Sequence, residues 1–291
     1  MYSDLIVGFD GSLAAHDALA FARRFALATG GRPRVVCVRP RGPVEPTLDI
    51  ARALIGDVPG VRFEAVAGTT AARGLCEAAG GAGAALIVLG ATHRSSRAAV
   101  PRTTAEAVIH AAPCAVAIAP AGFAERAARR PFGLVAAAVD GSGDTERVAR
   151  IAAGIAEGAG ADLRLVSVVD APYRDGPLYA GAIAYMTVAG ARRDAAAAAL
   201  ERAASAAVGV DVRVERRLCE GPLAEEIALR TREADLLVIG SRGLGSLGRV
   251  VLGAGTGRIL RAAACPVLVV PRRVRETLDQ ALVPLAGAGV R

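Results

Sequence analysis

The feature that most constrains the fold is an internal repeat of strand-ending motifs. Leu5 to Ser12 reads LIVGFDGS and Leu134 to Ser142 reads LVAAAVDGS, so each apolar run ends in Asp-Gly-Ser. Residues 86–90 and 236–240, LIVLG and LLVIG, form a second matching pair. A repeat at this separation predicts that the chain contains two copies of one structural unit.

Helical segments separate the predicted strands. Each Asp-Gly-Ser precedes an Ala-rich segment that predicts a helix, at 14–29 and 145–158. Each helix leads to a further apolar run, at 33–38 and 162–169, and each copy ends in an apolar strand, at 112–120 and 264–271. Strands that alternate with helices form parallel sheets with right-handed crossovers. We therefore predict two α/β domains.

Composition changes suggest where the domains end. We expect a first domain at 1–120, an Arg-rich linker without strand character at 121–131, a second domain at 132–271 and a C-terminal tail at 272–291. The second copy is longer because of residues 171–190, which carry three of the four tyrosines. This insertion is expected to be a loop, either a lid over the sheet edge or a segment that packs on the other domain.

Glycine is concentrated after the strand at 236–240. The glycines are Gly240, Gly243, Gly245, Gly248, Gly253, Gly255 and Gly257. Glycines at the carboxyl end of a parallel strand let backbone N–H groups approach an anion, and ligands of open parallel sheets bind at this edge. The leading hypothesis is a phosphate site, whereas the alternative is that the glycines only provide tight turns and close packing.

Two common phosphate motifs fit poorly. Residues 243–248 read GLGSLG, but a dinucleotide fingerprint needs an acidic residue about 20 positions on. No Asp or Glu occurs after Asp235 until Glu276. Gly248 to Gly253 has the spacing of a Walker A loop, yet Ala254 stands where the lysine is needed and the chain contains no lysine.

The third pattern, Gly240-x2-Gly243-x9-Gly253 before a helix and the strand CPVLVVP, resembles the ATP-binding signature of the universal stress protein family. The resemblance covers both copies and nearly the whole chain. It implies tandem Rossmann-like domains with flavodoxin-type layers, each a five-stranded parallel sheet between helices, with ATP bound across the carboxyl ends of the strands.

By the same resemblance, Asp140 lies at the adenosine pocket and Val168 meets the adenine. The residues expected around ribose and phosphates are Gly240, Gly243, Gly253, Ala254 and Gly255. Ala254 replaces the family's Ser or Thr, a hydroxyl that Thr256 could supply instead. Gly141, Ser142 and Arg242 neighbour these positions and complete the expected site. Asp140 could also hold an accompanying Mg²⁺ through water.

The first copy departs from this pattern. His93 replaces the second glycine, and Arg102-Thr103-Thr104 stands where the second copy has Gly253-Ala254-Gly255. We expect that this copy has lost its nucleotide site. The alternative is that Arg94, Arg97 and Arg102 bind an anion through their side chains.

Composition argues against several other classes. The net charge is +7, but the arginines are scattered and aromatic residues make up only 3% of the chain, so we expect no nucleic-acid partner. No apolar run reaches the roughly 18 residues of a membrane span, and the N-terminus lacks a signal sequence, so we expect a cytoplasmic location and no membrane partner. The five cysteines lack CxxC spacing and are expected to be buried thiols, with no metal site.

No catalytic constellation accompanies the nucleotide motif, so at most slow ATP hydrolysis is expected. We predict a nucleotide-dependent regulator of stress response or dormancy, with an unidentified protein partner. The rivals are an adenine-nucleotide enzyme and a nucleotide-free interaction module. The two copies are expected to pair through their last strands, at 113–119 and 266–270, because apolar edge strands need cover. Dimers of the whole chain are also expected.

Overall fold

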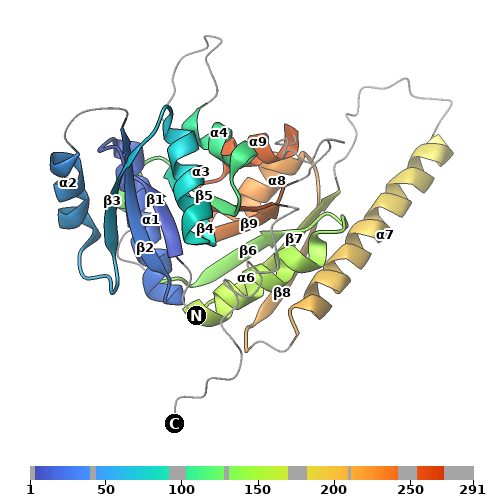
Figure 1. Ribbon diagram of the computed structural model, residues 1–291. Coiled ribbons are helices and arrows are strands. Elements are labelled where there is room, and N and C mark those ends of the chain that lie inside the picture. Colours follow the sequence, from blue (N-terminus) through green and yellow to red (C-terminus); the bar gives the residue numbers. More distant parts are fainter. Residues whose placement is uncertain are drawn as a thin grey trace.

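A computed structural model describes residues 4–39, 44–91, 103–127, 131–169, 182–208, 211–241 and 254–271. Ten strands of these ranges form one sheet in the order β3-β2-β1-β4-β5-β10-β9-β6-β7-β8 (Figure 1). All neighbours are parallel except β5 and β10. The order within each half, 3-2-1-4-5, is that of the first five strands of a Rossmann fold, and the predicted pair of five-stranded parallel sheets is confirmed.

The element bounds follow the repeat. The strands of the first half are β1 Asp4–Gly8, β2 Arg32–Arg39, β3 Arg62–Ala67, β4 Leu86–Gly90 and β5 Ala115–Ala119. Those of the second half are β6 Leu134–Ala138, β7 Asp162–Val169, β8 Val214–Glu220, β9 Leu236–Gly240 and β10 Val267–Val270. The helices are α1 Leu13–Thr29, α2 Glu45–Ile55, α3 Ala71–Ala82, α4 Thr104–Ala111, α5 Phe123–Ala127, α6 Thr145–Ala159, α7 Ala182–Ala206, α8 Leu223–Arg230 and α9 Ala254–Ala262.

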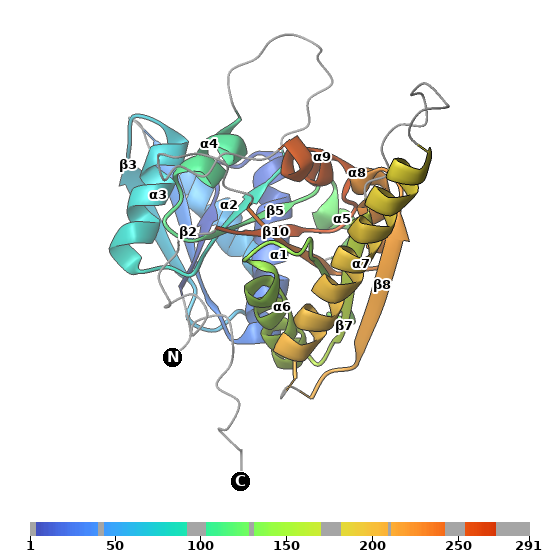
Figure 2. The ribbon, with the colours of Figure 1, turned by 90° about the vertical axis from the view of Figure 1, so that its right-hand side faces the viewer.

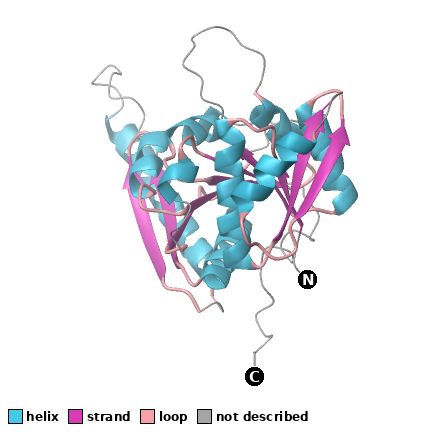
Figure 3. Cartoon of the chain, turned by 90° about the vertical axis from the view of Figure 1, so that its left-hand side faces the viewer, coloured by secondary structure: helices cyan, strands magenta, loops and turns pink. Residues whose placement is uncertain are grey.

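Helices cover both faces of the sheet (Figures 2 and 3). In each half the chain runs outward to the third strand (β3 or β8) and then returns to the other side of the first strand (β1 or β6). Right-handed crossovers therefore place the first two helices of each half on one face and the next two on the other. The central strands β4, β5, β9 and β10 are therefore buried almost along their whole length. This burial explains why they read as continuous apolar runs rather than as alternating patterns.

The two halves join through β5 and β10, as predicted. These strands pair antiparallel, with Ile118 opposite Val267 and Val116 opposite Val269. Every residue of both strands is buried. Each strand would otherwise be an exposed apolar edge, so the pairing satisfies two sets of backbone groups and removes two edges at once.

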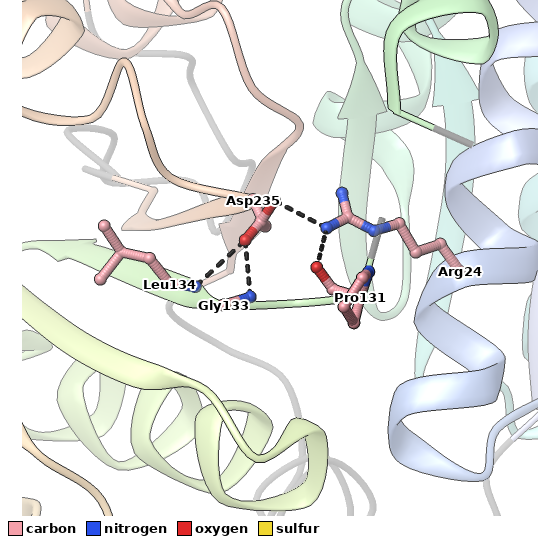
Figure 4. A network of polar contacts seen from close by, with 5 residues as sticks. All are labelled: Arg24, Pro131, Gly133, Leu134 and Asp235. Carbon is pink, nitrogen blue, oxygen red and sulfur yellow. Dashed lines mark hydrogen bonds and ion pairs between the residues drawn. The ribbon is translucent and has the colours of Figure 1, made fainter. Parts of the chain in front are cut away.

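A partly buried polar network strengthens this junction on the side of α1 (Figure 4). Arg24 of α1 forms an ion pair of 2.6 Å with Asp235, at the start of β9, and donates a hydrogen bond of 2.6 Å to the Pro131 carbonyl. Asp235 also accepts hydrogen bonds from the Gly133 and Leu134 backbone N–H groups, at 2.7 and 3.1 Å. One carboxylate thus ties α1 of the first half to β6 of the second.

The insertion and the linker differ from expectation in part. Residues 182–190 belong to α7, a helix that contacts α6, β7 and β8, so the prediction of a loop there is wrong. Residues 171–181 lie outside the described residues. The predicted linker contains the short helix α5, whose first N–H groups donate to the buried Asp17 carboxylate from Gly122 and Ala124. Alanine, the strongest helix former, is frequent at residues 191–206, and the helix of that stretch, α7, reaches back to Ala182.

All five cysteines lie in the described ranges and none forms a disulfide. Four of them are buried and Cys76 is partly buried, which confirms the expectation of buried thiols. Burial raises the pKa of Cys114 and of Cys265 to about 12, so both remain protonated thiols at neutral pH. Among the helices of the described ranges, none has the length and apolar character needed to cross a membrane.

Candidate functional site

A cavity of about 210 Å³ lies at the carboxyl ends of β6, β7 and β9 in the second half. This is the edge where ligands bind in open parallel sheets, and the strand order turns back between β6 and β9. The structure brings six of the expected site residues into its lining: Asp140, Ser142, Val168, Gly240, Gly255 and Thr256. Residues far apart in the sequence, such as Asp140 and Thr256, are thus gathered at one site.

The remaining expected residues are placed differently. Gly141 has a φ of 77°, a left-handed conformation that favours glycine, and it lies beside Ala199 of α7 rather than in the cavity lining. Arg242, Gly243 and Gly253 lie outside the described residues. Ala254 is the first residue of α9, and its side chain is likewise outside what the structure describes.

Several lining residues were missed by reasoning from the sequence. They are Asp144, Thr145, Val148, Val166, Leu223, Ile227, Ser241 and Ile259, together with Ala138, Val139 and Ile239 of the strand ends. Leu223 and Ile227 are four residues apart in α8, a spacing that puts both side chains on one helix face. That spacing could have been read from the sequence, but nothing in it showed that the face meets the end of β7.

The cavity combines an apolar wall with polar groups. Val166, Val168, Leu223 and Ile227 form the wall between β7 and α8. The polar lining consists of Asp140, Ser142, Asp144, Thr145, Ser241 and Thr256. A site of this kind suits a ligand with a flat apolar part and a polar part, and a few convergent polar groups in an apolar pocket are typical of small-molecule sites.

Asp140 is held by a turn of its own sequence. Its Oδ1 accepts a hydrogen bond of 2.9 Å from the Ser142 backbone N–H. Asp10 makes the same contact with Ser12 in the first half, at 3.0 Å. The Asp-Gly-Ser motif therefore fixes a carboxylate at the end of each first strand, and this local role is common to both halves.

Gly240 leaves the strand end open to the cavity. A Cβ placed on Gly240 would lie 3.4 Å from Val148 Cγ2 and 3.7 Å from the Asp144 Cβ, which are ordinary contacts. Thus the fold itself has room for a side chain at Gly240. Glycine here exposes backbone to the cavity, and α9 begins beside it with Gly255 and Thr256 in the lining. The predicted helix at this position is confirmed, and its N-terminal end carries partial positive charge toward the cavity.

The first half has a smaller cavity, of about 100 Å³, at the equivalent place. Its α1 begins at Leu13, where the Ser12 hydroxyl accepts from the Ala15 N–H at 3.2 Å. At the repeat position of Leu13 the second half has Gly143, and α6 begins two residues later, at Thr145. The earlier helix start fills the space: a Cβ on Gly90 would lie 1.8 Å from the Ala14 carbonyl oxygen. His93, Arg94, Arg97 and Arg102 lie outside the described residues.

The contact between Gly90 and α1 leads to a testable expectation. Gly90→Ala should lower the free energy of unfolding by about 1–3 kcal/mol, because the new methyl group overlaps backbone that cannot rotate away. Urea denaturation would measure the loss. An unfolding midpoint equal to that of the unmodified chain would contradict this account of why the first cavity is small.

Comparisons with known proteins agree with this architecture. A model of the universal stress protein family matches residues 132–271. A universal stress protein of Thermus aquaticus is 36% identical over 141 residues, which cover 48% of this chain and 98% of that relative.

Solved structures match over both halves. A crystal structure described as a universal stress protein from Pseudomonas aeruginosa superimposes with a TM-score of 0.65 at 19% identity, over 97% of this chain and 96% of that one. A universal stress protein from Archaeoglobus fulgidus gives 0.62 at 19% identity, over 93% and 96% of the two chains. At these identities the structures establish a shared fold.

Proposed function

Because the chain belongs to the universal stress protein family, we propose that its second half binds ATP and that the protein acts as a nucleotide-dependent regulator of a stress response or of dormancy. The observation that carries the proposal is the cavity at the ends of β6, β7 and β9. It joins an apolar wall, a fixed carboxylate and a glycine strand end beside a helix N-terminus.

Each part of an adenine nucleotide has a matching surface. The apolar wall of Val168, Leu223 and Ile227 suits the adenine ring. The Asp140 carboxylate accepts hydrogen bonds and suits ribose hydroxyls. Phosphates suit the start of α9, where Gly255 and Thr256 line the cavity and the N-terminal end of the helix is positive. Arg242, Gly243 and Gly253, which lie outside the described residues, are proposed to complete the phosphate site.

The first half is proposed to bind no nucleotide. Its cavity is about half as large, and the backbone of α1 closes on Gly90. We propose the same division as the repeat predicts: residues 1–120 form a structural domain and residues 132–271 the nucleotide-binding domain. A dimer of the whole chain remains a prediction, for which sedimentation in the ultracentrifuge is the direct measurement.

Regulation is favoured over catalysis by the composition of the site. Among the described residues that line the cavity there is no His, Cys or Arg to act as a base, a nucleophile or a cation on phosphate. Asp140 and Asp144 are the acids present. A carboxylate pair without further machinery supports slow ATP hydrolysis at most, so we propose that bound nucleotide changes what the protein contacts rather than being turned over.

Nucleotide content tests the proposal directly. The purified protein would be denatured, and any nucleotide released would be identified and counted by chromatography and mass spectrometry. We expect about one adenine nucleotide per chain, because one of the two cavities is closed. Two per chain would contradict the proposed loss of the first site. No nucleotide, together with no thermal shift in millimolar ATP, would favour a nucleotide-free interaction module.

A further inference from the structure

A buried hydroxyl in the candidate site has no hydrogen-bond partner in the described protein. Thr145 is the first residue of α6, is only 3% exposed and lines the cavity. Its Oγ1 is buried and makes no hydrogen bond with the described residues. Leaving a buried hydroxyl unpaired is unfavourable, and most such groups in folded proteins have a partner. No described residue is that partner, and because Thr145 lines the cavity, a molecule bound there is placed to supply one.

The internal repeat shows that this hydroxyl is not required by the fold. The cavity has three buried hydroxyl residues, and alanine stands at each equivalent position of the first half: Ala15 for Thr145, Ala91 for Ser241 and Ala105 for Thr256. Equivalent backbone contacts support the alignment, since the Ala91 N–H donates to Ala119 and the Ser241 N–H to Val270. The half with the small cavity folds with alanine at all three positions, so the hydroxyls are present only in the half with the larger cavity.

Charge separates two ends of the site. Asp140 and Asp144 lie at the end where α6 begins, and Asp144 immediately precedes Thr145. Asp144 also lies near Gly240, since its Cβ is 3.7 Å from where a Gly240 Cβ would be, whereas Gly255 and Thr256 of α9 have no acidic neighbour in sequence among the described lining residues. Carboxylates repel phosphate, so an anion is disfavoured near Thr145. A neutral hydroxyl is favoured there, because it can donate to a carboxylate and accept from, or donate to, a threonine.

We propose that the Thr145 hydroxyl forms a hydrogen bond with a ribose hydroxyl of the bound nucleotide, and that it makes this site selective for ribonucleotides over deoxyribonucleotides. The inference rests on the proposed nucleotide-binding function and adds to it a specificity-determining residue. Threonine in a helix populates two side-chain rotamers, so a single bond rotation can turn the hydroxyl toward the ligand.

The experiment compares three ligands and three proteins. Dissociation constants for ATP, 2′-deoxy-ATP and 3′-deoxy-ATP would be measured by titration calorimetry with the full chain, with Thr145→Val and with Thr145→Ser. Valine has nearly the same shape as threonine and removes only the hydroxyl, whereas serine retains it. We expect the unmodified chain to bind ATP about 10-fold more tightly than one of the deoxy analogues, the effect of one buried hydrogen bond. Thr145→Val should remove that preference, and Thr145→Ser should keep it.

Several outcomes would overturn the inference. They are no preference for ATP in the unmodified chain, an unchanged preference in Thr145→Val, or equal weakening of all three ligands in that variant. Failure of the proposed function looks different, because then the unmodified chain binds none of the three nucleotides.

The unliganded variants supply a second readout. Thr145→Val should have an unfolding midpoint in urea at least equal to that of the unmodified chain, because a methyl group replaces an unpaired hydroxyl in the same volume. A clear fall in the midpoint would show that the hydroxyl has a partner within the protein, and the premise would fail.

Discussion

Gly240→Ala is expected to weaken ATP binding by about 10- to 100-fold and to leave the fold intact. The added methyl group makes ordinary contacts with Val148 and Asp144, so the protein accommodates it. The methyl group also projects into the cavity, where it keeps the ligand from approaching the backbone at residue 240. Overpacking of this size costs about 1–3 kcal/mol. Titration calorimetry with ATP measures the affinity, and urea denaturation of the unliganded protein measures the stability.

The matched control is the same substitution at the equivalent glycine of the first half. Gly90→Ala should reduce stability through its overlap with the Ala14 carbonyl, whereas any ATP bound to the second half should keep its affinity. Gly240→Ala should therefore lower ATP affinity without lowering stability, whereas Gly90→Ala should lower stability without lowering ATP affinity. Equal ATP affinity in Gly240→Ala and in the unmodified chain would mean that the ligand does not approach this strand end.

Asp235→Ala is expected to lower the free energy of unfolding by about 3–5 kcal/mol, the largest change in stability that we predict. The Arg24 side chain is only 5% exposed and would lose its ion pair with Asp235, and the Gly133 and Leu134 N–H groups would lose this acceptor. Denaturation in urea, followed by circular dichroism, measures the change.

A second substitution separates the charge effect from other losses. Arg24→Met in the Asp235→Ala background removes the buried positive charge that Asp235 balanced and fills a similar volume, so it should recover part of the stability. The surface pair Arg73–Glu77, with side chains 69% and 55% exposed, is the control, and Glu77→Ala should give no measurable change. If Asp235→Ala matched Glu77→Ala, the network of Figure 4 would not hold the halves together.

The repeat allowed much of this architecture to be predicted from the sequence. Strand positions, the parallel order and the pairing of β5 with β10 all follow from apolar runs that have to be buried. The family resemblance assigned Asp140, Val168 and Gly240 to one site, and the structure brings them together because the carboxyl ends of neighbouring parallel strands meet at one edge.

The difference between the two cavities could not be predicted in this way. Both halves share Asp-Gly-Ser, yet α1 begins directly after its serine and α6 begins later. The cause is the next residue, since Leu13 continues a helix that Gly143 disfavours. The sequence did not identify Thr145 as a site residue either, because threonine is common near helix starts as a capping residue. Only its burial without a partner distinguishes it.

The antiparallel joint of β5 and β10 has a consequence for how the halves can change. In a symmetric dimer of identical chains, every substitution appears in both copies of a site. Here the two copies share one chain, so their association does not depend on protein concentration and each copy varies separately. A chain built this way can place alanine at Ala15 and keep threonine at Thr145. Because the two halves are covalently linked, the first half can lose residues of the ligand site while the second half keeps them.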